Sequence, residues 1–291
     1  MFTNKLYTPL RYPGGKARFA PLIVRVMEEN GLIGGHYLEL YAGGAGVALE
    51  LLLHGHASHI HINDLDPAVN AFWRGVTEFP ESMLRLLRDT PVCMDQWHHW
   101  RAVMRGERPS DVAELGFATL FMNRTNRSGI LKGGVIGGKD QSGTYRLDAR
   151  LKKDVLAARI ERIARESSHI SVYCEDALLL IRRCREFLPV RSLIYLDPPY
   201  YVKGRGLYRN YYAHDDHVAI AQFVQRKRFR RAWIVSYDDT APIRAMYASS
   251  QTLSYGLHYT AQERYTGGEV MFFSDRLNVS EVELPSGAYA A

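Results

Sequence analysis

The sequence predicts an α/β fold built on a mainly parallel sheet, and three stretches carry that prediction. Residues 37–41 alternate like a strand and run into a glycine loop at 42–46, which opens an apolar helix. A second strand is predicted at 59–64, where it ends in Asp64. A third is predicted at 192–196, where two prolines stop an apolar run because they lack the N–H that a ladder needs. In such sheets, ligands bind at the carboxyl ends of the strands.

The composition is that of a globular protein that favours an anionic partner. The 291 residues are 46% apolar and 23% charged, with a net charge of +6. Three cysteines without a C-x-x-C spacing argue against a disulfide framework and fit a reducing cytosol. No apolar run approaches the roughly 20 residues of a membrane span, so we expect a cytoplasmic protein with no membrane partner.

The N-terminal region begins with a loop from Leu10 to Lys16 that contains Pro-Gly-Gly. Glycines let backbone N–H groups approach a ligand, and Lys16 opens a predicted helix with Phe19 and Ile23 on one face. A plain N-terminal turn followed by a helix would give the same pattern.

The strand, glycine loop and helix at 37–52 form the arrangement that cradles a nucleotide. The loop lacks the dinucleotide G-x-G-x-x-G spacing and the Gly-Lys-Ser/Thr of a P-loop, which argues against an NAD-dependent enzyme and a P-loop protein. An acid at the end of the next strand can bind both hydroxyls of a ribose. Asp64 therefore indicates an adenosine-containing cofactor.

Histidines at four nearby positions raise the question of a metal site: His54, His56, His59 and His61. His59 and His61 share one face of the predicted strand, but nearby carboxylates are few and cysteine is absent. We therefore expect no metal and assign these histidines to a sheet edge or the surface.

A mainly helical region follows, with helices predicted at 68–79, 81–88, 95–105, 111–122 and 151–165. Before the last helix lies a long segment, 123–146, in which Gly, Lys, Arg, Asn and aromatic residues interleave. Loops this long are usually functional or disordered. Arg and Asn pair with base edges and Lys suits phosphates, so DNA contact and a solvated glycine-rich loop both fit. The candidate DNA-contacting residues are Asn123, Arg124, Asn126, Arg127, Lys132 and Lys139.

A further strand is predicted at 169–176 and ends in Asp176. This carboxylate can bond an adenine amino group or cap the helix predicted at 177–187, and the two roles are compatible.

Asp197, Pro198, Pro199 and Tyr200 end the strand at 192–196 and are the predicted catalytic residues. The exocyclic amine of a base is a poor nucleophile because its lone pair is delocalised into the ring. The Asp197 carboxylate and the Pro198 carbonyl can both accept its hydrogen bonds, which directs the lone pair at an incoming methyl group. Tyr200 offers a stacking face for a base that has left the duplex. An ordinary strand end with a Pro-Pro turn is the alternative.

After Tyr200 comes a basic, aromatic loop whose predicted DNA contacts are Lys203, Arg205 and Tyr208. A helix is predicted at 215–227. Strands predicted at 232–236, 251–255 and 270–273 give the sheet an antiparallel finish.

In their order, the Pro-Gly-Gly-Lys loop, the strand with its glycine loop, the Asn-Arg segment and Asp-Pro-Pro-Tyr resemble the Dam-like, or alpha, class of adenine-specific DNA methyltransferases. The resemblance implies a Rossmann-like seven-stranded sheet that binds S-adenosylmethionine. It implies a mainly helical target-recognition insertion at 76–165, with 1–75 and 166–291 forming the catalytic domain. It also implies a bacterial or phage origin and double-stranded DNA as the partner, and we expect a monomer or a weak dimer.

By this resemblance, a methyl group passes from S-adenosylmethionine to N6 of a flipped adenine in a specific DNA sequence. The implied cofactor contacts are Tyr12, Gly14, Gly15, Lys16, Tyr41, Gly43, Gly44, Gly46, Asp64, Asp176 and Asp197. Two features depart from the family. The glycine loop contains Ala45, which leaves its register ambiguous by one residue, and Ser128 stands where the family usually has asparagine. A cytosine amino-methyltransferase and a non-catalytic DNA-binding protein are the alternatives.

Overall fold

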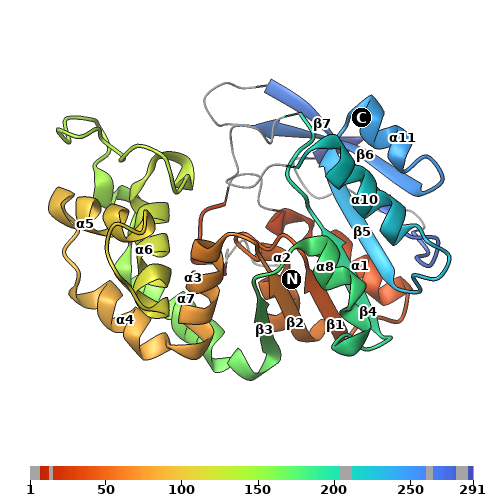
Figure 1. The fold of residues 1–291 in the computed structure, drawn as a ribbon, viewed down its shortest axis with the longest axis horizontal. Coiled ribbons are helices and arrows are strands. Elements are labelled where there is room, and N and C mark those ends of the chain that lie inside the picture. Colours follow the sequence, from red (N-terminus) through yellow and green to blue (C-terminus); the bar gives the residue numbers. More distant parts are fainter. Residues whose placement is uncertain (1–6, 13–15, 203–211, 260–264, 280–287, 291) are drawn as a thin grey trace.

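The computed structural model describes residues 7–12, 16–202, 212–259, 265–279 and 288–290. Its centre is an eight-stranded sheet with the order β3-β2-β1-β4-β5-β7-β6-β8 (Figure 1). Strands β1 to β5 are parallel, whereas β7 is antiparallel to β5 and β6, and β8 to β6. The strands are β1 (Gly35–Glu39), β2 (Ala57–Asn63), β3 (Ile170–Tyr173), β4 (Ser192–Leu196), β5 (Ala232–Asp238), β6 (Gln251–Tyr259), β7 (Tyr265–Phe273) and β8 (Ala288–Ala290).

The strand order reverses between β1 and β4, which positions the candidate site. The chain leaves β1 toward β2 and β3 on one side and later enters β4 on the other side of β1. Leu38 of β1 pairs with Ile194 of β4 across this junction. Loops after two such strands diverge and leave a crevice at their carboxyl ends. The glycine loop after β1 and Asp197 after β4 therefore meet at one edge of the sheet.

Helices connect and cover the strands. They are α1 (Ala20–Glu29), α2 (Gly46–Leu53), α3 (Pro67–Glu78), α4 (Pro80–Asp89), α5 (Met94–Met104), α6 (Val112–Thr125), α7 (Lys153–Arg165), α8 (Ala177–Arg182), α10 (His214–Val224) and α11 (Ala241–Met246). Short 3₁₀ turns are η1 (Ala17–Phe19), η2 (Arg127–Gly129), η3 (Leu147–Arg150), η4 (Ser167–His169) and η5 (Cys184–Glu186).

The predicted α/β fold is confirmed, and each of the seven predicted strands overlaps a strand of the structure. The predicted antiparallel finish is also confirmed. The short edge strand β8 and the helix α11 were not predicted. The predicted helix at 177–187 is shorter in the structure, because α8 ends at Arg182 and a 3₁₀ turn follows.

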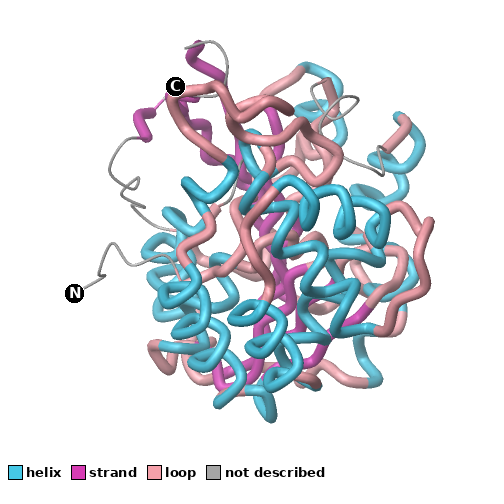
Figure 2. The backbone as a smooth tube through the Cα atoms, turned by 90° about the vertical axis from the view of Figure 1, so that its left-hand side faces the viewer, coloured by secondary structure: helices cyan, strands magenta, loops and turns pink. Residues whose placement is uncertain are grey.

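The sheet lies between two helical layers because side chains alternate along each strand. Tyr37 of β1 and Tyr195 of β4 belong to one apolar core, which α1, α2 and α3 complete. Their neighbours Leu38 and Ile194 belong to a second core, shared with α8, α10 and α11. Figure 2 shows the strands running through the middle of the molecule with helices around them. This is the layering of a Rossmann-like fold.

Helices α4 to α7 form a lobe beside the sheet, at the left of Figure 1. The lobe is fixed through α3, against which α6 packs closely. The Thr119 hydroxyl donates to the Ala68 carbonyl at 2.9 Å, and a Cβ on Gly116 would lie 2.5 Å from the Ala71 carbonyl oxygen. Apolar side chains of the lobe and of the sheet belong to one continuous core.

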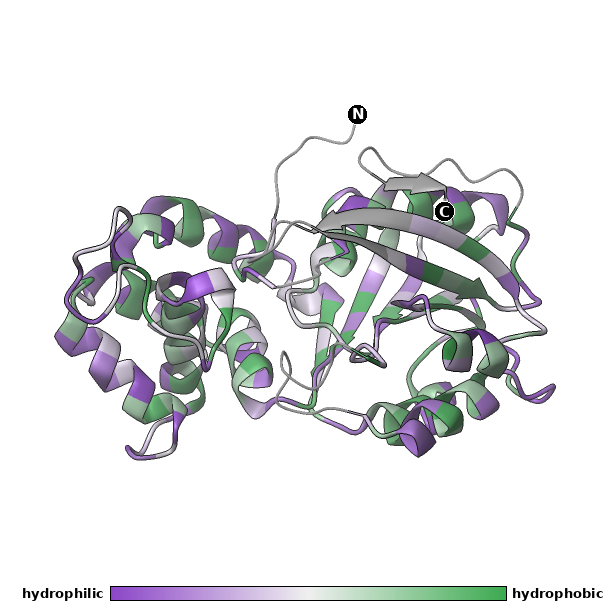
Figure 3. Cartoon of the chain, turned by 90° about the horizontal axis from the view of Figure 1, so that it is seen from above, coloured by the Kyte–Doolittle hydropathy of each residue, from purple (hydrophilic) through white to green (hydrophobic). Residues whose placement is uncertain are grey.

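Hydrophobic and hydrophilic residues alternate along the helices (Figure 3). This pattern is typical of helices with one buried face. Within the part of the chain that the structure describes, no helix is both long and apolar enough to cross a bilayer.

Candidate active site

Asp197 stands at the carboxyl end of β4, where neighbouring side chains hold one of its two carboxylate oxygens. Ser236 of β5 donates to Asp197 Oδ1 at 2.6 Å, and Tyr195 Oη lies 2.9 Å from the Ser236 hydroxyl. The Asp197 side chain is 21% exposed. Its second oxygen, Oδ2, forms no hydrogen bond with any residue that the structure describes. One carboxylate oxygen is therefore fixed and the other can accept from a substrate.

Lys16 places a buried positive charge beside this carboxylate. Its Nζ lies 3.3 Å from Asp197 Oδ1, donates to Tyr200 Oη at 2.9 Å and lies 3.2 Å from Glu269 Oε2. The Lys16 side chain is 3% exposed. The resemblance placed Lys16 with the cofactor contacts, whereas the structure brings its ammonium to the predicted catalytic residues Asp197 and Tyr200.

Glu269 of β7 completes this cluster, and sequence reasoning missed it. Tyr200 donates from Oη to Glu269 Oε1 at 2.6 Å, and Tyr255 of β6 donates to Oε2 at 2.8 Å. The Glu269 side chain is 1% exposed. The pairing of β7 with β5 brings it to the site from a distant part of the chain. Its one sequence signal is an acidic residue directly before the apolar run 270–273.

The charges in this cluster shift each other's titration. Burial raises the pKa of the Asp197 carboxyl above its ordinary value, although Lys16 and the Ser236 hydrogen bond oppose the rise. Burial alone would lower the pKa of Lys16, but the carboxylates of Asp197 and Glu269 outweigh it and hold that pKa well above its ordinary value. Lys16 therefore stays charged while two carboxylates share it.

The glycine loop packs beneath the N-terminal segment. A Cβ on Gly43, which has a φ of +46°, would lie 2.7 Å from the Tyr12 ring. A Cβ on Gly44 would lie 3.2 Å from Tyr12 Cβ, and one on Gly46 would lie 2.9 Å from Ala17 Cβ. Contacts under 3 Å are not tolerated without movement, so close approach explains glycine at 43 and 46. The structure thus brings Tyr12 and the loop together, while their contact with a cofactor stays a prediction.

Asp64 follows β2 and braces the same loop. Its Oδ2 accepts the N–H of Gly43 at 2.9 Å, and its Oδ1 accepts the N–H of Asp66 at 2.9 Å. Burial raises the pKa of Asp64 to about 6. Each carboxylate oxygen can accept two hydrogen bonds, so both retain capacity for a ribose hydroxyl.

Asp176 and Tyr41 lie at the same edge, after β3 and β1. Asp176 Oδ1 accepts the N–H of Leu179 at 3.0 Å, which confirms the predicted helix cap. Its contact with an adenine amino group stays a prediction. Tyr41 donates from its hydroxyl to Tyr212 Oη at 2.8 Å, a partner that precedes α10.

Two predicted DNA-contacting side chains are instead used inside the protein. Asn123 is 1% exposed, and its amide bonds the N–H and the C=O of Arg11 at 2.7 and 2.8 Å. The buried Asn126 accepts from Trp97 Nε1 at 2.8 Å and donates to two backbone carbonyls. The expectation that these amides read bases is contradicted, because their polar atoms already bond to the protein.

The other predicted DNA contacts differ in exposure. Arg124 is half-buried and donates from Nε to the Pro9 carbonyl at 2.7 Å, and burial lowers its pKa to about 10. Arg127, Lys132 and Lys139 are exposed on the segment after α6. Five predicted residues lie outside the described part of the chain: Gly14, Gly15, Lys203, Arg205 and Tyr208.

The histidines near β2 form a row across the sheet. His61 Nε2 lies 3.0 Å from His36 Nδ1, and His61 Nδ1 lies 3.1 Å from the Tyr173 hydroxyl. His61 is 3% exposed, so the expectation of an edge or surface position was wrong for this residue. No group of three or more metal-ligating side chains is arranged around an ion position among the described residues.

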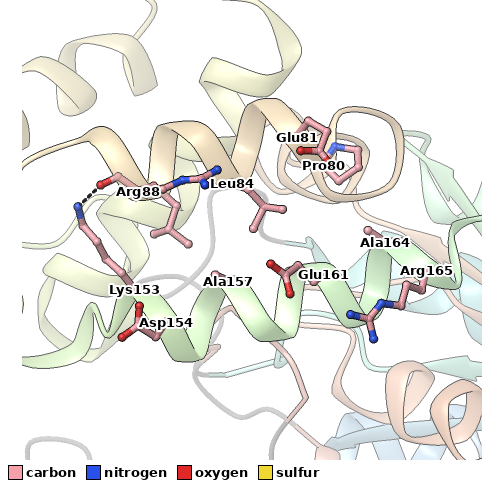
Figure 4. A pocket seen from close by; sticks show the side chains of 11 residues that line it. Pro80, Glu81, Leu84, Arg88, Lys153, Asp154, Ala157, Glu161, Ala164 and Arg165 are labelled. Carbon is pink, nitrogen blue, oxygen red and sulfur yellow. Dashed lines mark hydrogen bonds between the residues drawn. The ribbon is translucent and has the colours of Figure 1, made fainter.

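A groove lies apart from this site, between α4 and α7 (Figure 4). Leu84, Ala157 and Glu161 line it, and at one end Lys153 donates to the Arg88 carbonyl at 2.7 Å. None of the predicted catalytic or cofactor residues lines this groove. The groove is therefore separate from the candidate active site at the carboxyl edge of the sheet.

Comparison with known proteins agrees with the geometry of this edge. The family model described as D12 class N6 adenine-specific DNA methyltransferase matches residues 12–264. No curated protein sequence matches the chain significantly.

Solved structures resemble the chain only distantly. A putative RNA methyltransferase from Pyrococcus horikoshii is 12% identical, with 94% of this chain and 89% of that chain covered and a TM-score of 0.42. M. capricolum TrmK in complex with S-adenosyl-homocysteine is 6% identical, with 89% and 71% covered and a TM-score of 0.37. A dimethyladenosine transferase from Plasmodium falciparum is 8% identical, with 91% and 63% covered and a TM-score of 0.35. At these values, the likenesses carry no argument about substrate.

Proposed function

Because this chain belongs to the D12 class of N6 adenine-specific DNA methyltransferases, we propose that its methyl transfer takes place where β1 and β4 end. The protein is an adenine-specific DNA methyltransferase that uses S-adenosylmethionine. The observation that carries the proposed location is Asp197 with one oxygen fixed by Ser236 and Lys16 and the other available to a substrate.

The residues at this edge fit S-adenosylmethionine. Gly43 and Gly44 form a close-packed loop under Tyr12, and Asp64 stands at the end of the neighbouring strand with spare acceptor capacity. We assign the methionine part to the glycine loop, the ribose to Asp64 and the adenine to Asp176. When bound, the cofactor supplies an electrophilic methyl group on a positively charged sulfur. The acidic groups at the strand ends favour that charge.

The acceptor adenine is positioned by Asp197, Pro198, Pro199 and Tyr200. An adenine inside a duplex cannot reach this crevice, so the base must leave the stack. Asp197 and the Pro198 carbonyl would accept hydrogen bonds from the two N–H groups of N6, which would direct its lone pair at the methyl group. The new N6–C bond would form as the S–C bond breaks, and N6 would then release one of its two protons to solvent. Pro199 stiffens the turn that carries both acceptors. The Tyr200 ring stacks on the base, while its hydroxyl is held by Lys16 and Glu269.

DNA recognition is assigned to the helical insertion at 76–165 and to the loop after Tyr200. Support comes from the exposed side chains of Arg127, Lys132 and Lys139 on the segment after α6. We assign 1–75 and 166–291 to the catalytic domain. Within that family we propose the Dam-like alpha class, which the motif order supports, with the glycine loop first and Asp197-Pro198 last. We propose that it acts on double-stranded DNA as a monomer or weak dimer in a bacterial or phage-infected cell.

The test is methyl transfer from labelled S-adenosylmethionine to unmethylated genomic DNA, followed by single-molecule sequencing and nucleoside analysis. N6-methyladenine confined to one short motif is expected, and N4-methylcytosine would instead indicate the cytosine enzyme. Asp197→Asn should lower turnover at least about 100-fold while DNA affinity stays within about twofold. Undiminished turnover in this variant would refute the proposed site.

A further inference from the structure

Lys16 is buried beside two carboxylates, Asp197 and Glu269, although one would be enough to neutralise its charge. Glu269 is 1% exposed, accepts hydrogen bonds from Tyr200 and Tyr255, and forms an ion pair with the Lys16 ammonium. All three contacts are with donors, so they suit an ionised carboxylate. A buried charge is costly unless it is paired, and an apolar residue would fill a strand interior at lower cost. Because Glu269 lies beside the proposed catalytic carboxylate, we infer that it has a role in the reaction.

The geometry shows how Glu269 acts on Asp197 through Lys16. The Lys16 ammonium lies 3.2 Å from Glu269 Oε2 and 3.3 Å from Asp197 Oδ1, so the two carboxylates share it almost equally. A lysine ammonium that faced Asp197 alone would withdraw more of its negative charge. Sharing leaves Asp197 a stronger acceptor, while Ser236 keeps Oδ1 in place and Oδ2 available.

Glu269 also orients the residue expected to stack on the base. Its Oε1 accepts from the Tyr200 hydroxyl at 2.6 Å, and Lys16 donates to the same hydroxyl at 2.9 Å. The Tyr200 oxygen is thus held between an acceptor and a donor, which fixes the direction of its ring. One buried side chain therefore controls both groups that would hold the adenine.

We propose that Glu269 is a positioning residue for methyl transfer, which holds Lys16 midway between two carboxylates and so maintains Asp197 as a strong acceptor for the adenine amino group. This inference rests on the proposed role of Asp197. Nothing in the family match assigns a role to Glu269.

The effect of Glu269 on Asp197 can be measured through the pH dependence of kcat. Among the described residues, the titratable groups that act on Asp197 come from the N-terminal segment and from β1, β4 and β7: Lys16, Tyr37, Glu39, Tyr195 and Glu269. Tyr255 of β6 acts on Lys16 and Glu269. The charge of Glu269 raises the pKa of Asp197, so its removal lowers that pKa. If the reaction requires ionised Asp197, kcat falls at low pH as Asp197 is protonated, and we call this fall the acid limb of the profile. When the pKa of Asp197 is lowered, the acid limb moves to lower pH.

The experiment compares Glu269→Gln with Glu269→Asp and with Glu50→Gln. Glutamine keeps the shape of Glu269 but removes its charge, whereas aspartate keeps the charge. Glu50 is a buried glutamate on α2 outside the site and controls for the loss of any buried carboxylate. Each variant is assayed for thermal unfolding, for S-adenosylmethionine and DNA affinity, and for kcat from pH 4.5 to 9.

In Glu269→Gln we expect kcat at pH 7.5 to fall about 10- to 100-fold, both affinities to stay within about twofold, and the acid limb to shift downward. Glu269→Asp should keep the acid limb near its original pH, and Glu50→Gln should keep both the limb and the rate. An unmoved acid limb in Glu269→Gln would overturn the inference even if the rate fell, because loss of packing alone does not shift it.

Asp197→Asn, assayed in parallel, separates this inference from the proposed site. Undiminished turnover in Asp197→Asn would reject the site and the inference with it. An impaired Asp197→Asn together with a wild-type profile in Glu269→Gln would reject the role of Glu269 alone. If Glu269→Gln turns over too slowly for a kcat–pH profile, the pKa of Asp197 can be measured by NMR with labelled aspartate. A pKa equal to that of the parent protein would reject the proposed role of Glu269.

Discussion

The side-chain amide of Asn123 bonds both backbone groups of Arg11, accepting from its N–H at 2.7 Å and donating to its carbonyl at 2.8 Å. A third hydrogen bond runs from the same amide nitrogen to the Gly129 carbonyl at 2.8 Å. This one side chain thus fixes both the N-terminal segment and the start of the segment that follows α6 to the end of that helix. Tyr12 follows Arg11 directly, so the cover of the glycine loop depends on Asn123.

Asn123→Ala is therefore expected to destabilise the fold and not simply to alter base recognition. It leaves up to three buried backbone groups without partners, and we expect a loss of roughly 2–4 kcal/mol in the free energy of unfolding. Urea unfolding measures this loss. Asn30→Ala is the matched control, since Asn30 is half-buried at the end of α1 and away from the site. A loss no larger than that of the control would contradict the structural role.

Three exposed cations should contribute to DNA affinity but not to stability: Arg127, Lys132 and Lys139. Replacing all three by alanine is expected to leave the unfolding midpoint within about 1 °C, because exposed side chains contribute little to stability. If each contacts a phosphate, the slope of log K against log salt decreases in magnitude by about 2.7, since each phosphate contact contributes about 0.9. Fluorescence anisotropy at four salt concentrations gives the slope. An unchanged slope would place the DNA elsewhere.

Gly43→Ala should impair cofactor binding through a clash. The added Cβ would lie 2.7 Å from the Tyr12 ring, and the φ of +46° adds backbone strain. We expect a loss of about 2–4 kcal/mol in stability and at least a tenfold weaker binding of S-adenosylmethionine, measured by calorimetry. Gly55→Ala is the control, because Gly55 also has positive φ but no atom within 4 Å of an added Cβ. Equal losses in both variants would mean that backbone strain, and not the contact with Tyr12, causes the effect.

His61 is expected to make the fold sensitive to mild acid. Burial lowers its pKa to about 3, whereas an unfolded chain titrates it near 6.5. Its folded-state pKa is lowered, so its contribution to stability is complete above pH 6.5 and declines as the pH falls toward 3. Between pH 7.5 and pH 5 the loss is about 2 kcal/mol, at about 1.4 kcal/mol for each pH unit below 6.5.

The test is urea unfolding of His61→Phe at both pH values. The variant should lose about 2 kcal/mol less than the parent protein over this range. His98→Phe, which replaces an exposed histidine on α5, should lose as much as the parent. An equal pH dependence in all three proteins would show that His61 does not govern acid stability.

The fold was readily predicted because local patterns determine it. The two prolines after β4, the glycine loop after β1 and the apolar periodicity of α3 to α7 each mark an element independently of the rest of the chain. Helix α11 was missed because its six residues, Ala241–Met246, are too short for a period to show. The edge strand β8 was missed because its three residues carry no alternating pattern.

The positions of Asp64 and Asp197 at the carboxyl edge of the sheet were predictable, because local sequence marks the end of each strand. Glu269 could not be predicted, because its position in the site depends on the antiparallel pairing of β7 with β5. The prediction that Asn123 and Asn126 contact DNA was wrong for a related reason. A polar side chain after a helix has the same sequence signal whether it faces DNA or satisfies buried backbone groups, and only tertiary packing separates the two.

The continuous apolar core across the lobe and the sheet limits which parts of the lobe can be exchanged without disturbing the fold. A chimera that exchanged residues 76–165 as a block would have to rebuild the packing of α6 on α3, where Gly116 meets a backbone carbonyl without room for a methyl group. Val135 and Leu147 are buried in that core, but the stretch between them is largely exposed. Transplanting this short stretch leaves the core intact, so if it contacts DNA as proposed, a graft of this surface could change the target sequence without rebuilding the fold.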